Sequence, residues 1–199
     1  MTARMVPAAA EIHRQVNPES RSARMGPSYC AAFLGWFLRE EHGTVALAAL
    51  DGDGRIVGYA VGAPLGYAAI SSRHLAWSAA AAVLRRPWVV FARRFRRGLP
   101  GRLRVLFGRP ADTDAVPRVP QPAMSLVAMG VVESARRMGV GTALVAAFES
   151  KALERRMRSV RLSTRADNVS ARRFYERCGW KPLARTGEQA YYVRVLSER

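Results

Sequence analysis

A glycine-bearing turn between an apolar run and a long amphipathic stretch constrains this chain more than any other feature. Residues 124–132 suit a buried central strand, and residues 139–157 follow as a predicted helix. Gly139 and Gly141 lie at the start of this helix, where the first amide groups have no acceptor within the helix and point outward. These amides and the helix dipole together attract anions, so the sequence predicts a phosphate-binding turn.

Positive side chains stand beside the same glycines and strengthen this prediction. Arg136 and Arg137 precede the helix, and a pyrophosphate would be held mainly by main-chain amides from about residue 137 to residue 142. The residues expected to contact it are Arg136, Arg137, Met138, Gly139, Val140, Gly141 and Thr142. Taken alone, an ordinary glycine-rich turn with exposed arginines explains the pattern equally well, because short glycine motifs recur by chance.

A second segment, about 30 residues farther on, changes that balance. Residues 168–180 follow a predicted strand at 159–164 and span a predicted helix at 170–178. The two segments, in this order and at this distance, resemble the GCN5-related N-acetyltransferase (GNAT) superfamily. The matching positions are Arg136, Gly139 and Gly141 in the first motif, and Asn168, Ala171, Phe174, Tyr175, Gly179 and Trp180 in the second. One departure is Glu133, which stands where many relatives carry proline.

The resemblance implies an α/β fold with a mixed central sheet, splayed between its fourth and fifth strands, and helices on both faces. We expect one domain over residues 1–199. The clearest local pattern is a β-hairpin, in which residues 44–50 and 55–62 flank a turn at 51–54 and are similar to the family's second and third strands. Other expected elements are a strand at 1–6, helices at 8–16 and 28–41, and a last pair of strands from 180 to about 195.

The resemblance also implies a reaction, in which an amine attacks the thioester of acetyl-CoA directly. The pantetheine arm of the cofactor would pair with the strand at 124–132, with Val131 and Val132 at its lower end and an amide near Met129 facing the oxyanion. Tyr175 is the candidate acid for the departing thiolate and lies near the sulfur by the same resemblance. Asn168, in the motif with Ala171, would hold the pantetheine arm, cap its helix, or do both.

The base that takes the amine proton stays open, because the strand at 124–132 carries no glutamate or histidine. Glu40, Glu41 and Glu133 are the candidates. The three histidines, His13, His42 and His74, are widely scattered, and the two cysteines, Cys30 and Cys178, have no partner cluster. We therefore expect no metal site, no disulfide framework and no cysteine nucleophile.

Residues 66 to about 120 form an insertion that is rich in arginine and contributes to a formal net charge of +17. Three interpretations compete: a flap that binds an anionic acceptor such as a nucleotide sugar, an amphipathic surface for acidic lipid headgroups, and a solvated or dimer-forming helix pair. The superfamily includes members with an insertion of this kind, which resemble polysaccharide-biosynthesis acetyltransferases.

The preferred function is transfer of an acetyl group to a primary amine of an amino sugar or another small molecule. The alternatives are a protein or peptide N-acetyltransferase and a basic nucleic-acid-binding module on an inactive GNAT scaffold, which no recognised nucleic-acid motif supports. No apolar run reaches membrane-span length and no secretory signal is apparent, so we expect a cytoplasmic protein, with the membrane surface as a second location.

Overall fold

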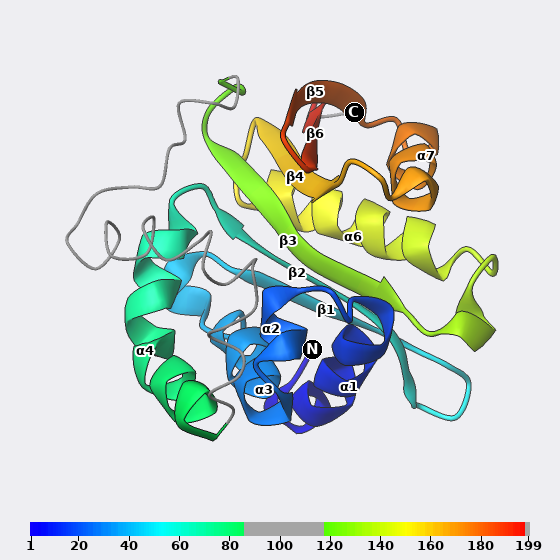
Figure 1. The fold of residues 1–199 in the computed structure, drawn as a ribbon. Helices are drawn as coiled ribbons and strands as arrows, with labels where there is room; N and C mark the ends of the chain where they lie inside the picture. The colour runs from blue at the N-terminus through cyan, green and yellow to red at the C-terminus, as the bar shows by residue number, and fades with distance from the viewer. Residues whose placement is uncertain (86–117, 198–199) are drawn as a thin grey trace.

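The computed structural model describes residues 1–85 and 118–197 of the chain, and its centre is a six-stranded sheet (Figure 1). The strands follow the order β1-β2-β3-β4-β6-β5 across the sheet, and only the β3–β4 pair is parallel. Their bounds are β1 Val45–Leu50, β2 Ile56–Pro64, β3 Ala123–Val131, β4 Ser159–Arg165, β5 Lys181–Thr186 and β6 Gln189–Val195. The mixed sheet that the resemblance implied is therefore confirmed.

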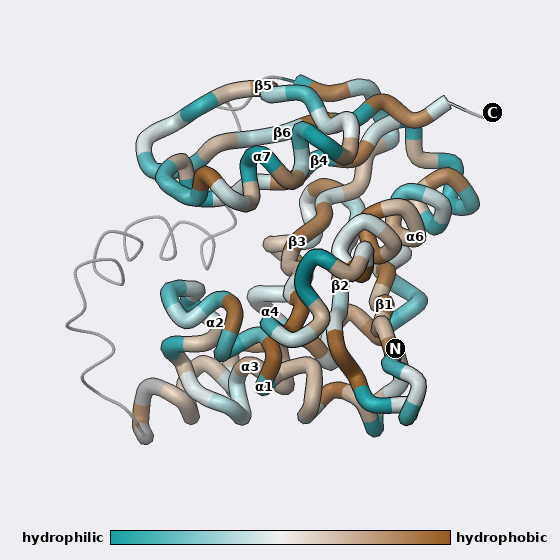
Figure 2. The backbone as a smooth tube through the Cα atoms, turned by 90° about the vertical axis from the view of Figure 1, so that its right-hand side faces the viewer, coloured by the Kyte–Doolittle hydropathy of each residue, from teal (hydrophilic) through white to brown (hydrophobic). Residues whose placement is uncertain are grey.

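Helices lie on both faces of the sheet. The α-helices are α1 Val6–Val16, α2 Arg21–Arg24, α3 Pro27–Trp36, α4 Tyr67–Arg85, α6 Val140–Glu154 and α7 Val169–Arg177. The apolar sides of α1 and α3 share one buried cluster with β2, whereas α6 packs on the opposite face against β1 to β4. In Figure 2 hydrophobic residues gather along β2 and β3, and hydrophilic residues prevail on α7 and β5.

The strands β3 and β4 are paired over only part of their length. Ala123 to Leu126 pair in register with Ser159 to Leu162, and beyond Leu126 the two strands separate while β3 stays paired with β2. This separation is the splay expected of the family's fourth and fifth strands. It leaves one edge of β3 without a strand partner, which positions the candidate site.

Two expectations for the N-terminal half are wrong. The strand expected at residues 1–6 is a 3-10 turn, Ala3–Met5, followed by α1, and Pro7 in the first turn of α1 explains why. Proline fixes a helical φ there and lacks only an amide that would have no acceptor anyway. The helix expected at 28–41 ends at Trp36, because the amides of Leu38 and Arg39 donate to carbonyls three residues back instead of four and Arg39 is extended.

The other expected elements are confirmed with small shifts at their ends. The β1–β2 hairpin closes through Asp51, whose side chain accepts from the amides of Asp53 (3.0 Å) and Arg55 (2.8 Å). Helix α6 ends at Glu154, three residues before its expected end at 157. Helix α4 occupies the start of the expected insertion, whereas the predictions made for residues 86–117 lie outside the described residues.

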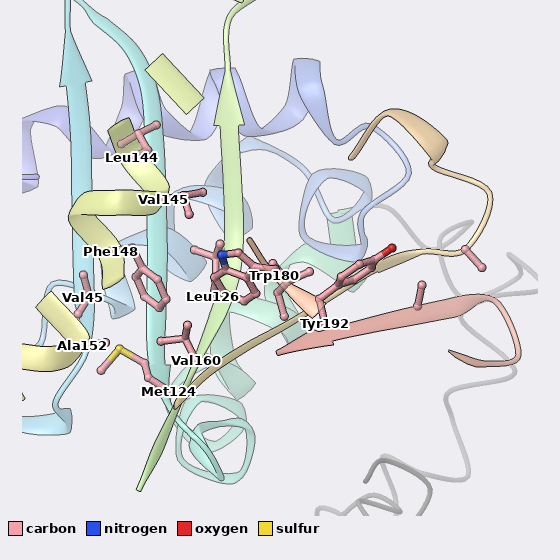
Figure 3. Packing of buried hydrophobic residues seen from close by; sticks show 14 residues of the cluster. Val45, Met124, Leu126, Leu144, Val145, Phe148, Ala152, Val160, Trp180 and Tyr192 are labelled. Carbon is pink, nitrogen blue, oxygen red and sulfur yellow. The ribbon is translucent and has the colours of Figure 1, made fainter. Parts of the chain in front are cut away.

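The core between α6 and the sheet depends on close approach at β2. The ring of Phe148 is fully buried, and in Figure 3 it lies with Leu126 and Val160 where α6 meets the strands. Gly62 of β2 faces this ring, and a β-carbon there would overlap it and approach the Ser125 carbonyl oxygen to 2.6 Å. Glycine is needed at this position because the helix rests directly on the strand backbone.

We expect Gly62→Ala to destabilise the fold by about 1–3 kcal/mol, since an extra methyl group in a filled core forces its neighbours to shift. Gly52→Ala is the matched control, because a β-carbon at Gly52 meets nothing within 4 Å. Urea unfolding of both variants measures the free energies of unfolding. Equal values for the two would show that α6 is free to move away from β2.

Candidate active site

A cavity of about 840 Å³ occupies the gap between β3 and β4. Its walls are Leu126 to Val131 on β3, Leu162 to Thr164 on β4, the start of α6, the inner side of α7 and the end of α1. Of the residues predicted to contact the cofactor, those that line it are Met129, Val131, Arg136, Arg137, Gly139, Gly141, Thr142, Asn168, Ala171 and Tyr175. Two motifs about 30 residues apart thus meet around one cavity.

Three other predicted contacts do not reach the cavity wall. Val132 follows β3, and its amide already donates to the Val57 carbonyl (2.9 Å). The Met138 side chain is 73% exposed, and Val140 is only partly exposed at the first position of α6. These side chains lie outside the wall that the remaining predicted residues share.

The free edge of β3 presents main-chain groups to the cavity. Because hydrogen-bonded and non-hydrogen-bonded pairs alternate in an antiparallel ladder, the Val132–Val57 bond makes Gly130 and Tyr59 the next bonded pair. The amides and carbonyls of Met129 and Val131 then point away from β2, into the gap. The Met129 carbonyl accepts from Asn17 Nδ2 (3.3 Å) and the Val131 carbonyl from Arg136 Nε (3.4 Å).

The N-terminus of α6 forms one end of the cavity. Gly139 precedes this helix at φ +82°, and a β-carbon there would meet nothing within 4 Å. The first ladder bond runs from the Ala143 amide to the Gly139 carbonyl (2.9 Å), so the amides of residues 140–142 come before the ladder and have no acceptor in the helix. Arg136 and Arg137 lie beside these amides in the cavity wall, and this is the place for which the sequence predicts an anion site.

Helix α7 brings Tyr175 to the other side of the gap. Asn168 caps this helix by accepting from the Ala171 amide (3.0 Å), which is one of the two roles expected of it. The Tyr175 ring lies in an aromatic cluster with Trp180 and Tyr192, at centroid distances of 5.9 and 6.4 Å. Burial raises the pKa of the Tyr175 phenol above its ordinary value, so this group stays protonated at neutral pH.

An ion pair anchors the end of α7. Glu149 on α6 accepts from Trp180 Nε1 (2.8 Å) and pairs with Arg194 Nε (3.3 Å), and Arg194 also donates to the Cys178 carbonyl. Burial raises the pKa of the Glu149 carboxyl, while Arg194 and Trp180 oppose that shift. The contacts tie the second motif to α6 and so hold Tyr175 in place.

Residues 104–180 match the family model described as the acetyltransferase (GNAT) family. This match spans both motifs that form the cavity. The part of the chain that carries both motifs therefore matches the GNAT acetyltransferase family. The matched family is one of acetyltransferases, and acetyl-CoA is the acyl donor that the GNAT family uses.

Solved structures share the GNAT fold with this chain at low sequence identity. SsHAT is 23% identical over 100% of this chain and 96% of its own, with a TM-score of 0.61. Ard1 from Thermoplasma volcanium is 19% identical over 100% of this chain and 95% of its own, with a TM-score of 0.59. PaiA N-acetyltransferase from Thermoplasma acidophilum, in complex with coenzyme A, is 11% identical over 98% of this chain and 96% of its own, with a TM-score of 0.59. No curated protein matches the chain by sequence.

None of the three glutamates considered as the base lies in this cavity. Glu133 is exposed in a 3-10 turn, Glu133–Ala135, and Glu40 and Glu41 are exposed in another, Glu40–His42. The structure instead places His13, Asn17 and Ser20 in the cavity wall. Sequence reasoning missed His13, although its position on the apolar side of α1, three and four residues after Ala10 and Ala9, signals a buried histidine.

Among residues 1–85 and 118–197, no three histidine, cysteine or acidic side chains come together as a metal site. None of the helices there combines the length and the apolar character that a bilayer span needs.

Proposed function

We propose that this GNAT enzyme transfers the acetyl group of acetyl-CoA to a primary amine of a small molecule, such as an amino sugar. One observation carries the proposal: the free edge of β3 leads along a single cavity to the free amides at the start of α6. A strand edge suits the amide groups of a pantetheine arm, and a helix N-terminus suits a pyrophosphate. This order of strand edge and helix N-terminus supports acetyl-CoA as the cosubstrate.

The described residues fit this cosubstrate. Gly139 leaves open space at the anion site, and Arg136 and Arg137 supply positive charge beside it. The thioester would lie between the Met129 amide and Tyr175, on opposite sides of the gap. PaiA N-acetyltransferase shares this fold and is in complex with coenzyme A, which supports a coenzyme A thioester as the cosubstrate.

The proposed chemistry is direct transfer. The amine nitrogen attacks the thioester carbon, and the Met129 amide stabilises the developing oxyanion. The carbon–sulfur bond then breaks, and Tyr175 gives its proton to the departing thiolate. Alignment of the two substrates in one cavity contributes by lowering the entropic cost of their encounter.

The acceptor end of the cavity supports a small amine over a protein N-terminus. The wall there offers uncharged polar groups, on His13, Asn17 and Ser20. Such groups hydrogen-bond to hydroxylated small molecules without fixing a charge pattern.

Thermal unfolding with acetyl-CoA tests the donor half of the proposal. We expect stabilisation of about 2.7 kcal/mol at a hundred times the dissociation constant. ATP is the control, because a chain with a net charge of +17 attracts any anion, but ATP lacks the pantetheine arm and thioester. Equal stabilisation by ATP and acetyl-CoA would show that non-specific charge attraction explains the binding, and would contradict the proposed donor site.

Mass spectrometry of an acceptor panel tests the other half. Amino sugars, nucleotide amino sugars and polyamines should gain one acetyl group, whereas peptides with free N-termini should gain little. Acetylation confined to the peptides would instead establish a protein or peptide N-acetyltransferase.

A further inference from the structure

A chain of hydrogen bonds runs from the cavity wall into the core through His13. This side chain is only 3% exposed, yet it lines the cavity together with Ser20. Its Nε2 contacts Ser20 Oγ (3.0 Å) and Ser22 Oγ (2.7 Å), while its Nδ1 is hydrogen-bonded to the Tyr59 hydroxyl. A buried imidazole is thus connected to the cavity by the Ser20 hydroxyl and fixed in the core by the hydroxyls of Ser22 and Tyr59.

The cluster around this ring is uncharged at neutral pH. Burial lowers the pKa of His13 to about 4, so the imidazole is neutral and keeps one lone pair free to accept a proton. The titratable groups packed near it are Tyr59 on β2 and Cys30 on α3. Burial raises the pKa of both, that of Cys30 to about 11, and both therefore stay protonated.

The end of α1 places this cluster next to Met129 of β3, where the proposed transfer takes place. Asn17 ends α1 and donates to the Met129 carbonyl (3.3 Å), which belongs to the residue whose amide faces the oxyanion. His13 and Asn17 are four residues apart and so lie on the same side of the chain as it leaves α1. Ser20 caps α2 by accepting from the Ala23 amide (3.2 Å), which holds its hydroxyl beside His13.

We propose that His13 is the proton acceptor of the transfer and receives the amine proton through Ser20. The inference rests on the proposed function. As the nitrogen–carbon bond forms, Ser20 Oγ takes the proton from the amine and passes its own to His13 Nε2. The carbon–sulfur bond breaks and Tyr175 protonates the thiolate. Exchange with solvent later removes the added proton from His13 and returns a proton to Tyr175. The Tyr59 hydroxyl keeps the imidazole ring oriented throughout.

Replacing His13 by glutamine tests the inference, because glutamine keeps hydrogen-bonding groups but does not accept a proton. We expect turnover with the best amine of the panel to fall about a hundredfold. Stabilisation by acetyl-CoA should be unchanged, and its loss would count against the proposed donor site instead. His74→Gln, at an exposed position of α4, should keep full turnover.

Comparison of two nucleophiles separates proton transfer from a purely structural role. The nitrogen of hydroxylamine is weakly basic and gives up its proton more readily as the new bond forms. His13→Gln should therefore lose less than about tenfold with hydroxylamine, against about a hundredfold with the more basic amine. Equal losses with the two nucleophiles would overturn the proposal.

Nitrogen NMR of the wild-type imidazoles gives a test that does not depend on any variant folding. The chain has three histidines, so the signal that belongs to the buried ring is readily assigned. We expect a neutral His13 ring at pH 7 that gains its second proton only near pH 4. A ring that is already doubly protonated at pH 7 has no lone pair to offer and would exclude His13 as the acceptor.

Discussion

Gly139→Val is expected to weaken acetyl-CoA binding about a hundredfold while the chain remains folded. Gly139 stands at the cavity end of α6, where a branched side chain would occupy the space of a phosphate and displace it from the helix amides. Loss of two charge-assisted hydrogen bonds, each about 1.5 kcal/mol, corresponds to this factor. Titration calorimetry with acetyl-CoA measures the change directly.

Gly54→Val provides a matched control for this variant. Gly54 lies in the β1–β2 turn at φ +75°, close to the +82° of Gly139, and a β-carbon at either position meets nothing within 4 Å. Both variants should therefore lose a similar free energy of unfolding from backbone strain, about 1–2 kcal/mol. Only Gly139→Val should lose affinity for acetyl-CoA. An equal loss of affinity in Gly54→Val would show that the start of α6 is not the anion site.

The C-terminal half of this fold was predictable because its signals are local. Gly139 and Gly141 open a helix directly after a strand, and Asn168 stands at the start of another helix, so the sequence alone places the anion site and the cap. The apolar run in the sequence predicts a central strand, and β3 indeed lies inside the sheet between β2 and β4. The strand edge, the anion site and Tyr175 thus follow from neighbouring residues.

The N-terminal half was less predictable because distant contacts decide it. The Met1 ammonium donates to the Ala46 carbonyl (2.9 Å), which fixes the chain end beside β1 without any strand at residues 1–6. His13 is held in the core by Tyr59, which is 46 residues away on β2. A scan for histidine pairs or triads along the sequence does not find such a partnership, although the apolar side of α1 does reveal that His13 is buried.

The same reasoning explains why the sequence suggested proton acceptors that lie outside the cavity. Glu40, Glu41 and Glu133 drew attention because carboxylates are common proton acceptors, but all three are exposed and outside the cavity. The groups that do face the acceptor end are neutral. A base search that starts from charge alone overlooks a neutral imidazole whose pKa is lowered by burial.

Tyr175→Phe is expected to lower turnover about a hundredfold with little change in acetyl-CoA affinity. Phenylalanine keeps the ring contacts with Trp180 and Tyr192 but removes the proton that the thiolate needs. Because burial raises the pKa of Tyr175, the phenol keeps this proton to a pH above its ordinary pKa, and wild-type activity should not fall from this cause at mildly alkaline pH. Separate measurement of kcat and of the dissociation constant distinguishes the two effects.

Tyr192→Phe tests whether the effect belongs to Tyr175 or to the aromatic cluster as a whole. The Tyr192 hydroxyl donates to Glu176 Oε1 (2.8 Å) and accepts from Arg172 Nε (3.2 Å), so its removal should cost about 1 kcal/mol of stability. Turnover should be kept, because this hydroxyl is already bonded within the fold. If both variants lost turnover equally, the ring cluster would act only by supporting α7, and another group would have to protonate the thiolate.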